Sequence, residues 1–164
     1  MPLTLDAAVF ANSQLDVKGT RTEDGQTLSI LFGALSATSE VDDVDPAPDA
    51  VHADGEIRCT GTGWVEVQVR GAGHLSDARG LAHVVVWANG KRSSLTADAE
   101  EEPLFGALTC RVVDGEPLRI SLTLLAQRDL SSPTSAAACW VDSIDIKTLD
   151  VKPSRHHQAR LGAP

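Results

Sequence analysis

The segment Trp64–Arg70 reads WVEVQVR, and it decides the fold class of the chain. Apolar and polar residues alternate along it, so the three valines fall on one face and the charged and amide side chains on the other. Successive side chains of an extended strand point to opposite faces, so this pattern is typical of a strand with one face in a core. We therefore predict a half-buried β-strand here.

The same alternation recurs along the chain. Pro117–Leu124 reads PLRISLTL, and Trp140–Ile146 alternates less strictly. Leu3–Phe10 and Gln26–Phe32 also have the composition of strands. The two regular segments predict a set of buried residues, namely Val65, Val67, Val69, Leu118, Ile120, Leu122 and Leu124. The outward positions predicted with them are Glu66, Gln68, Arg119 and Thr123.

Turn signals separate these segments. Asn89-Gly90 follows the apolar run Val84–Ala88, and Asp114-Gly115 precedes Pro117–Leu124. Asn-Gly and Asp-Gly supply the positive φ angles of a type I′ turn, so each pair predicts a hairpin. With about eight or nine strands and no helical spacing, we expect an all-β fold, an antiparallel β-sandwich or jelly roll.

The length of 164 residues fits one domain. We expect a single sandwich domain over residues 1–152 and a polar, basic C-terminal tail over 153–164. Three segments rich in Gly, Pro, Ser or Asp are predicted to be loops: Ser39–Gly55, Gly71–Gly80 and Arg128–Ala136.

The charge balance bears on partners. Fourteen Lys and Arg against 23 Asp and Glu give a net charge of −9, which repels phosphate backbones and anionic lipids. Neither a nucleic acid nor a membrane surface is therefore expected as a partner. The chain has an odd number of cysteines, three, and shows neither a secretion signal nor a long apolar run. Reduced thiols and a cytoplasmic location are therefore expected.

The acidic segment before residue 55 has some features of a calcium loop. Asp43, Asp45, Asp49 and Asp54 fall at positions one, three, seven and twelve of an EF-hand-like count. The sixth position is Pro48 where glycine is required, and Asp54 is shorter than the bidentate glutamate that closes such a loop. A solvated acidic loop is therefore expected, with a calcium site as the alternative.

Catalytic signatures are missing from the sequence. No G-x-S-x-G segment occurs, and no cysteine has a base at a recognisable spacing. Gly71-Ala72-Gly73 lacks the third glycine of the dinucleotide fingerprint. We expect a protein that is not an enzyme and has no cofactor.

The aromatic residues admit two interpretations. The chain has three Trp, three Phe and no Tyr, and we expect each tryptophan to pack in the core. As an alternative, Trp87 at the sandwich rim would form a ligand site with His74, Asp77 and Arg79 from the Gly-rich segment.

The last predicted strand, over Cys139–Ile146, resembles the final strand of galactose-binding-type jelly rolls. That resemblance implies that the chain ends beside its first strand. It assigns no binding residues, because a fold does not determine a function.

Two functions remain open from the sequence. The first is a self-assembling structural component of a bacterial or phage assembly, a homo-oligomer held by exposed sheet edges and by the tail residues Arg155, Arg160 and Leu161. The alternative is a jelly-roll module that binds a carbohydrate or a small ligand, with calcium as an aid.

Overall fold

The computed structural model of the chain describes residues 3–10, 17–23, 25–40, 49–76, 79–97, 102–132 and 134–149. Within these residues the chain forms ten strands and no helix. The strands are β1 Thr4–Phe10, β2 Val17–Glu23, β3 Thr27–Ser39, β4 Asp49–Thr60, β5 Gly63–Leu75, β6 Leu81–Ala88, β7 Lys91–Thr96, β8 Glu102–Val112, β9 Leu118–Gln127 and β10 Ala137–Leu149.

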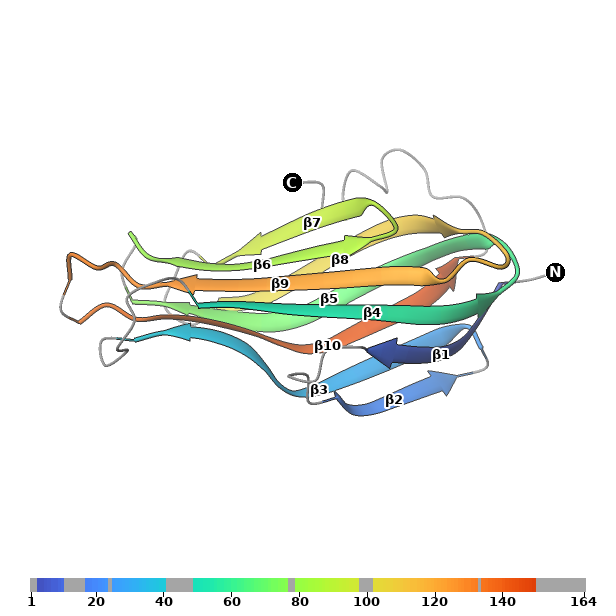
Figure 1. The fold of residues 1–164 in the computed structure, drawn as a ribbon, viewed down its shortest axis with the longest axis horizontal. Coiled ribbons are helices and arrows are strands. Elements are labelled where there is room, and N and C mark those ends of the chain that lie inside the picture. Colours follow the sequence, from blue (N-terminus) through green and yellow to red (C-terminus); the bar gives the residue numbers. More distant parts are fainter. Residues whose placement is uncertain are drawn as a thin grey trace.

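The strands form two antiparallel sheets that pack face to face (Figure 1). Sheet A has the order β1-β4-β9-β6-β7, and sheet B has the order β2-β3-β10-β5-β8. At one edge Leu95 of β7 lies against Gly106 of β8, and at the other the Leu5 amide donates a hydrogen bond of 2.8 Å to the Gly25 carbonyl. The all-β sandwich predicted from the alternation is confirmed.

The core lies between the two inner faces and is built by the predicted alternation. The three valines of WVEVQVR are 0% exposed, and the four apolar residues of β9 are at most 1% exposed. Leu28, Ile30, Ile57, Ile144 and Ile146 complete its largest fully buried side chains, together with Leu5. The inward side chains of the strands form the core, so the side chains available to a ligand are those on the outer faces of the two sheets.

The Asn89-Gly90 turn forms as predicted. Both residues have positive φ angles, 45° and 82°, and the turn joins β6 to β7 in register from His83↔Thr96 to Ala88↔Lys91. The Asn89 side chain accepts a 2.8 Å hydrogen bond from the Arg119 amide, which ties the turn to β9.

The hairpin predicted at Asp114-Gly115 is wrong. The two strands on either side, β8 and β9, belong to different sheets, so this connection crosses the sandwich. Gly115 alone has a positive φ, 86°, and the Glu116 amide donates to the Val113 carbonyl at 3.0 Å. A β-turn with one positive φ at its third residue reverses the chain without pairing its flanks.

Two of the predicted loops are partly strands. Asp49–Gly55 belongs to β4, and Gly71–Leu75 belongs to β5. Their glycines allow close approach rather than a turn: a Cβ at Gly71 would lie 2.0 Å from the Trp140 carbonyl oxygen, and one at Gly55 would lie 2.3 Å from the Phe10 ring. Arg128–Ala136 joins β9 to β10 and contains no strand among its described residues.

The last strand does not end beside the first. β10 lies between β3 and β5 in sheet B, whereas β1 is at the edge of sheet A. A register shift between Val141 and Ser143 marks a β-bulge, which explains the weaker alternation of this segment. After the bulge, Ile144 and Ile146 return to the core and Asp145 faces outward.

Candidate functional site

All three tryptophans lie outside the buried core. Trp64 and Trp140 are half-buried on the outer face of sheet B, and Trp87 is 36% exposed on the outer face of sheet A. The prediction that they pack in the core is therefore wrong. The core is mainly aliphatic, and its aromatic members are Phe32 and, packed against it, Phe10.

The outer face of sheet B carries three rings at defined register positions. Trp140 on β10 is opposite Ala72, and Phe105 on β8 is opposite Arg70. Trp64 lies at the other end of β5, opposite Arg111. Phe105 is 56% exposed, the largest exposed fraction among the exposed large apolar residues of the described chain. Aromatic side chains thus lie at both ends of this face.

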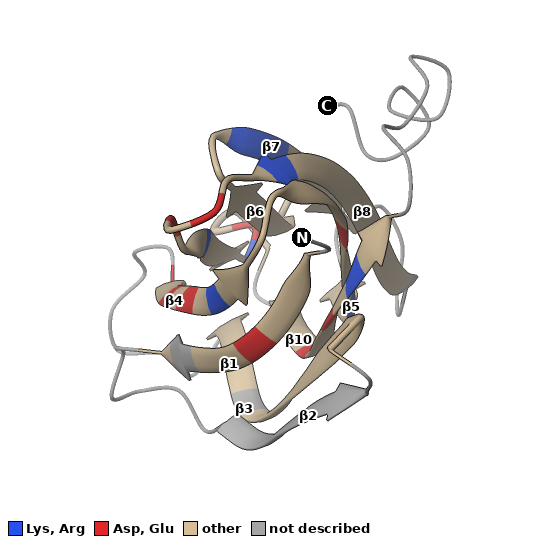
Figure 2. Cartoon of the chain, turned by 90° about the vertical axis from the view of Figure 1, so that its right-hand side faces the viewer, with Lys and Arg blue, Asp and Glu red and all other residues tan. Residues whose placement is uncertain are grey.

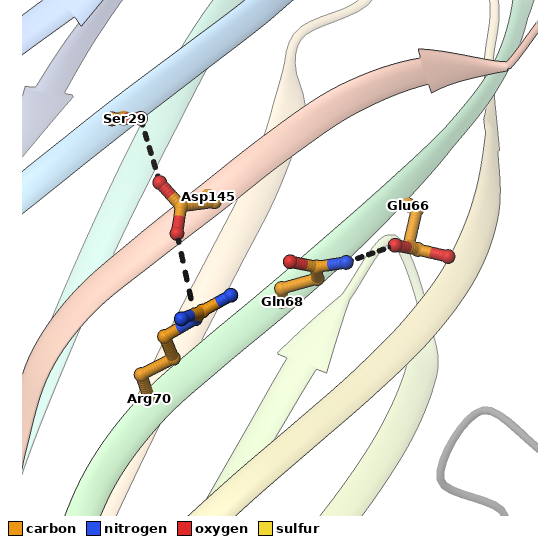
Figure 3. Close-up of polar contacts among 5 residues, drawn as sticks. All are labelled: Ser29, Glu66, Gln68, Arg70 and Asp145. Atoms are coloured by element: carbon orange, nitrogen blue, oxygen red, sulfur yellow. Dashed lines mark hydrogen bonds and ion pairs between the residues drawn. The ribbon is translucent and has the colours of Figure 1, made fainter.

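Between these rings lies a set of polar side chains that we call the sheet B cluster: Ser29, Glu66, Gln68, Arg70 and Asp145 (Figure 3). Ser29, Asp145 and Gln68 occupy one row across β3, β10 and β5. The Ser29 hydroxyl donates a 2.6 Å hydrogen bond to Asp145 Oδ1, and Arg70 Nε lies 3.9 Å from Asp145 Oδ2. Each oxygen of the carboxylate is therefore held by a different strand.

Two further contacts order the cluster. The Gln68 amide donates a hydrogen bond to the Glu66 carboxylate, two residues earlier on the same face. The Arg70 guanidinium lies 5.6 Å from the centroid of the Phe105 ring, within the range of a cation–π contact. The side chain of Asp145 is 31% exposed and that of Arg70 is 61% exposed, so both remain accessible to a ligand. Planar acceptors and donors are therefore held in place beside an exposed ring.

The outer face of sheet A has a second polar and aromatic row, which we call the Trp87 row: Asp54, Ser121, Trp87 and Arg92. These residues are direct cross-strand neighbours on β4, β9, β6 and β7. The Ser121 hydroxyl donates to Asp54 Oδ1 at 2.7 Å, and the Arg92 guanidinium lies 6.0 Å from the Trp87 ring centroid. The row thus has a carboxylate at one end and a guanidinium at the other.

The ligand site proposed from the sequence is spread over the molecule. His74 lies on the outer face of sheet B, opposite Ala138, whereas Trp87 lies on the outer face of sheet A. Arg79 is exposed between β5 and β6, and Asp77 lies outside the described residues. Trp87 is six residues along β6 from Leu81, roughly 20 Å at strand rise. The structure therefore places His74 and Trp87 on opposite outer faces of the sandwich.

The two described aspartates among those considered for calcium have different hydrogen-bond partners. Asp49 Oδ2 accepts a 2.9 Å hydrogen bond from the Thr38 amide, and Asp54 is bonded to Ser121 in the Trp87 row. Asp43 and Asp45 lie outside the described residues. Within the described ranges, no group of three or more His, Cys, Asp or Glu side chains is placed to hold a metal ion.

The three cysteines are free thiols. Burial raises the pKa of Cys110 to about 12, with a smaller contribution from Cys59, and burial also raises the pKa of Cys139. Burial followed by the charge of Arg92 lowers the pKa of His83, a neighbour on the face of the Trp87 row. The two buried thiols are thus protonated at neutral pH, and thiolate chemistry is not available to them.

The tail residues Arg155, Arg160 and Leu161 lie outside the described residues, so their predicted partner contact stays a prediction. In the part of the chain that the structure describes, no helix is long and apolar enough to span a membrane. The cytoplasmic location also stays a prediction.

Comparison with known proteins places the chain by fold only. No protein family matches the sequence, and no curated protein matches it. A carbohydrate-binding module, TmCBM61 in complex with β-1,4-galactotriose, aligns with 90% of this chain and 88% of its own at 10% identity and a TM-score of 0.37. The module CBM6cm-2 from Cellvibrio mixtus lichenase 5A, in complex with cellotriose, aligns with 88% of this chain and 98% of its own at 10% identity and a TM-score of 0.32.

An unrelated type of protein shares the sandwich as well. Eiger TNF from S. frugiperda aligns with 93% of this chain and 97% of its own at 12% identity and a TM-score of 0.34. Likeness at this level concerns the fold, and it carries no ligand and no residue over to this chain.

The first function predicted from the sequence, a self-assembling structural component, is contradicted by these comparisons. The solved structures that share the fold include several carbohydrate-binding modules. The homo-oligomer expected with the first function stays a prediction.

Proposed function

We propose that the protein binds carbohydrate without catalysis, through the outer face of sheet B. The observation that carries the proposal is the combination, on this one face, of Phe105, Trp140 and Trp64 with the sheet B cluster. Rings left on the surface of a sheet lose no contact with the core and gain packing area when a ligand covers them.

The chemistry of a sugar matches these groups. A pyranose ring has an apolar face of C–H groups that packs on an aromatic ring, while its hydroxyls lie around the rim and both donate and accept. Asp145 accepts from such hydroxyls, and Arg70 donates to them. Because Ser29 and Arg70 already hold the Asp145 carboxylate, little side-chain entropy is lost when a sugar binds.

The charge of the molecule favours this ligand over a phosphate-bearing one. The chain carries −9, so a polyanion is repelled at long range. A neutral saccharide feels no such field. The cluster itself contains two acids and one arginine, which suits hydroxyl groups better than an anion.

The experiment is a titration of the full chain, by isothermal calorimetry, with neutral oligosaccharides that include cellotriose and β-1,4-galactotriose. The expected result is binding that Phe105→Ala weakens about tenfold, the effect of losing roughly 1.4 kcal/mol of stacking and packing. Leu130→Ala is the matched control, because Leu130 is 55% exposed but lies in the β9–β10 connection.

Two results would count against the proposal. One is the absence of binding to every neutral saccharide on a broad glycan array. The other is equal weakening by Phe105→Ala and Leu130→Ala. An effect that is the same at both positions could not be assigned to the outer face of sheet B. Asp145→Asn separates the polar contribution, because it keeps the shape of the side chain but replaces one acceptor oxygen by a donor.

The sequence also left open whether calcium assists the binding of the carbohydrate. The titration is therefore repeated after chelation with EGTA. If calcium assists binding, chelation lowers the affinity and added calcium restores it; unchanged affinity would reject calcium assistance.

A further inference from the structure

The Trp87 row is on the opposite outer face from the sheet B cluster, and its residues form one line across four strands. Asp54 is opposite Ser121, Ser121 is opposite Trp87, and Trp87 is opposite Arg92. Three strand spacings of about 4.8 Å make the line roughly 14 Å long. The line is therefore long enough for more than one group of a small ligand.

The two ends of the row carry opposite charges. The acidic end is hydrogen-bonded within the row, whereas the basic end has no acidic partner among the described residues. Asp54 is held by the Ser121 hydroxyl at 2.7 Å. Arg92 lies over the Trp87 ring and donates a long 3.4 Å contact to the Ser94 hydroxyl. Among the described residues no carboxylate is in ion-pair distance of Arg92, whereas Arg119 on the same face is 3.6 Å from Glu56. Arg92 is thus a positioned guanidinium whose fork has no anion among those residues.

The electrostatic surroundings of Arg92 are basic. Lys91 is its neighbour on β7, and both are exposed. Basic segments of β7 are blue in Figure 2. Burial is the larger cause of the lowered pKa of His83, and the Arg92 charge adds to it. On the outer face of β6, His83 is two outward positions from Trp87, with Val85 between them, so its imidazole feels the Arg92 charge. In a chain of −9, two adjacent basic residues thus begin this edge strand.

We propose that the Trp87 row is a second binding site, whose ligand is a sugar that bears a carboxylate, that is, a uronate. The ligand carboxylate pairs with the Arg92 fork, which matches a planar carboxylate through two parallel hydrogen bonds. The sugar ring packs on the exposed part of Trp87, and its hydroxyls meet Ser121 and Asp54. Asp54 repels the carboxylate, so the ligand is oriented with its acid group toward β7.

The test uses trigalacturonate and its methyl ester, which differ in charge but share their rings. Each is titrated calorimetrically into the full chain. We expect trigalacturonate to bind about tenfold more tightly than the ester, and Arg92→Ala to abolish that difference. Arg92→Lys should recover part of it, since lysine keeps the charge and loses the fork.

Arg58→Ala is the matched control. Arg58 is an exposed arginine on β4, opposite Ala7 and away from the Trp87 row, and its removal changes the net charge by the same amount. Equal effects of Arg58→Ala and Arg92→Ala would overturn the proposal, because they would show attraction by net charge alone. Equal affinity of the wild-type chain for the acid and the ester would overturn it as well.

Two further measurements separate the role of Arg92 in binding from an effect on folding and from binding at the outer face of sheet B. Thermal unfolding followed by circular dichroism should be unchanged in Arg92→Ala, because Arg92 is exposed on an edge strand. Phe105→Ala should leave the binding of trigalacturonate unchanged. Loss of trigalacturonate binding in Phe105→Ala would instead assign the acid to the sheet B face and overturn the second site.

Discussion

At the scale of single residues, the interior and the surface follow different rules. An inward valine of β5 has no exposed surface, so any polar atom there loses water and gains no partner. An outward residue on the same strand keeps its access to water and is free to serve a ligand. WVEVQVR therefore supplies both core and candidate site from one segment, with Gln68 and Arg70 in the sheet B cluster.

Val67→Asp tests the inward assignment. Val67 is 0% exposed, and an isolated carboxylate at this position costs several kcal/mol or is forced to remain protonated. We expect a large loss of stability in chemical denaturation. Val113→Asp is the control, since Val113 is 43% exposed; a melt of Val67→Asp equal to that of the wild type would mean that the strand faces are reversed.

Cys110 predicts how stability depends on alkaline pH. Its pKa is raised to about 12 in the folded chain from an ordinary value of 9.0, so the folded state retains the proton that the unfolded state releases. This contribution is complete below pH 9 and is lost as the pH rises from 9 toward 12, at about 1.4 kcal/mol per pH unit.

The measurement is urea denaturation at several pH values between 8 and roughly 11, a window within which this thiol dominates the difference between wild type and Cys110→Ala. The alanine variant should be less stable at pH 8, because it leaves a small cavity, and should show a flatter decline above pH 9. Parallel curves for the two proteins would show that Cys110 is not buried in the way described.

At the scale of elements, the β6–β7 hairpin controls the Trp87 row. The Asn89-Gly90 turn fixes the register that sets Arg92 opposite Trp87. Gly90→Val forces a β-branched residue to a φ of 82°, where nothing lies within 4 Å of the added Cβ. The cost of about 1–3 kcal/mol is therefore backbone strain rather than collision. Denaturation midpoints should fall accordingly, and an unchanged midpoint would contradict the type I′ geometry.

The hairpins also show where a sequence pattern is ambiguous. Asn89-Gly90 and Asp114-Gly115 look alike as dipeptides, yet only the first closes a pair of neighbouring strands. Alternation identifies the strands because it reports burial, which is local to each strand. Strand order depends on contacts between distant segments, so neither the crossing at residue 115 nor the place of β10 follows from the local pattern.

The candidate site was partly predictable for the same reason. The outward positions Glu66 and Gln68 followed from alternation, but their meeting with Ser29 and Asp145 required the pairing of β3, β10 and β5. The tryptophans were expected in the core because they lie within or beside predicted strands and because the chain has no Tyr. The alternation did contain the signal, because Trp64 has the same parity as Glu66 and Gln68, and Trp140 has the same parity as Asp142. The bulge after Val141 adds a residue that strict alternation cannot anticipate.

At the scale of the whole molecule, the two proposed sites point away from each other. The sheet B cluster and the Trp87 row lie on opposite outer faces, with two sheets and the core between them. Each site uses the outer face of its own sheet, and packed sheets are separated by about 10 Å. A polysaccharide that presents neutral and acidic segments would be bound by both faces, and linked sites raise the overall affinity without any new contact.

This arrangement predicts independence for small ligands. Phe105 and Arg92 project from the outer faces of different sheets and contact different aromatic or basic partners, so the effects of Phe105→Ala and Arg92→Ala should add within about 0.3–0.5 kcal/mol. The measurement is a double-mutant cycle with cellotriose and trigalacturonate, each titrated into the wild type, both single variants and the double variant. Each ligand should respond to one substitution only, and the double variant should lose both. A coupling energy well above that range would mean that the faces communicate through the core or share one ligand, and the two-site description would then fail.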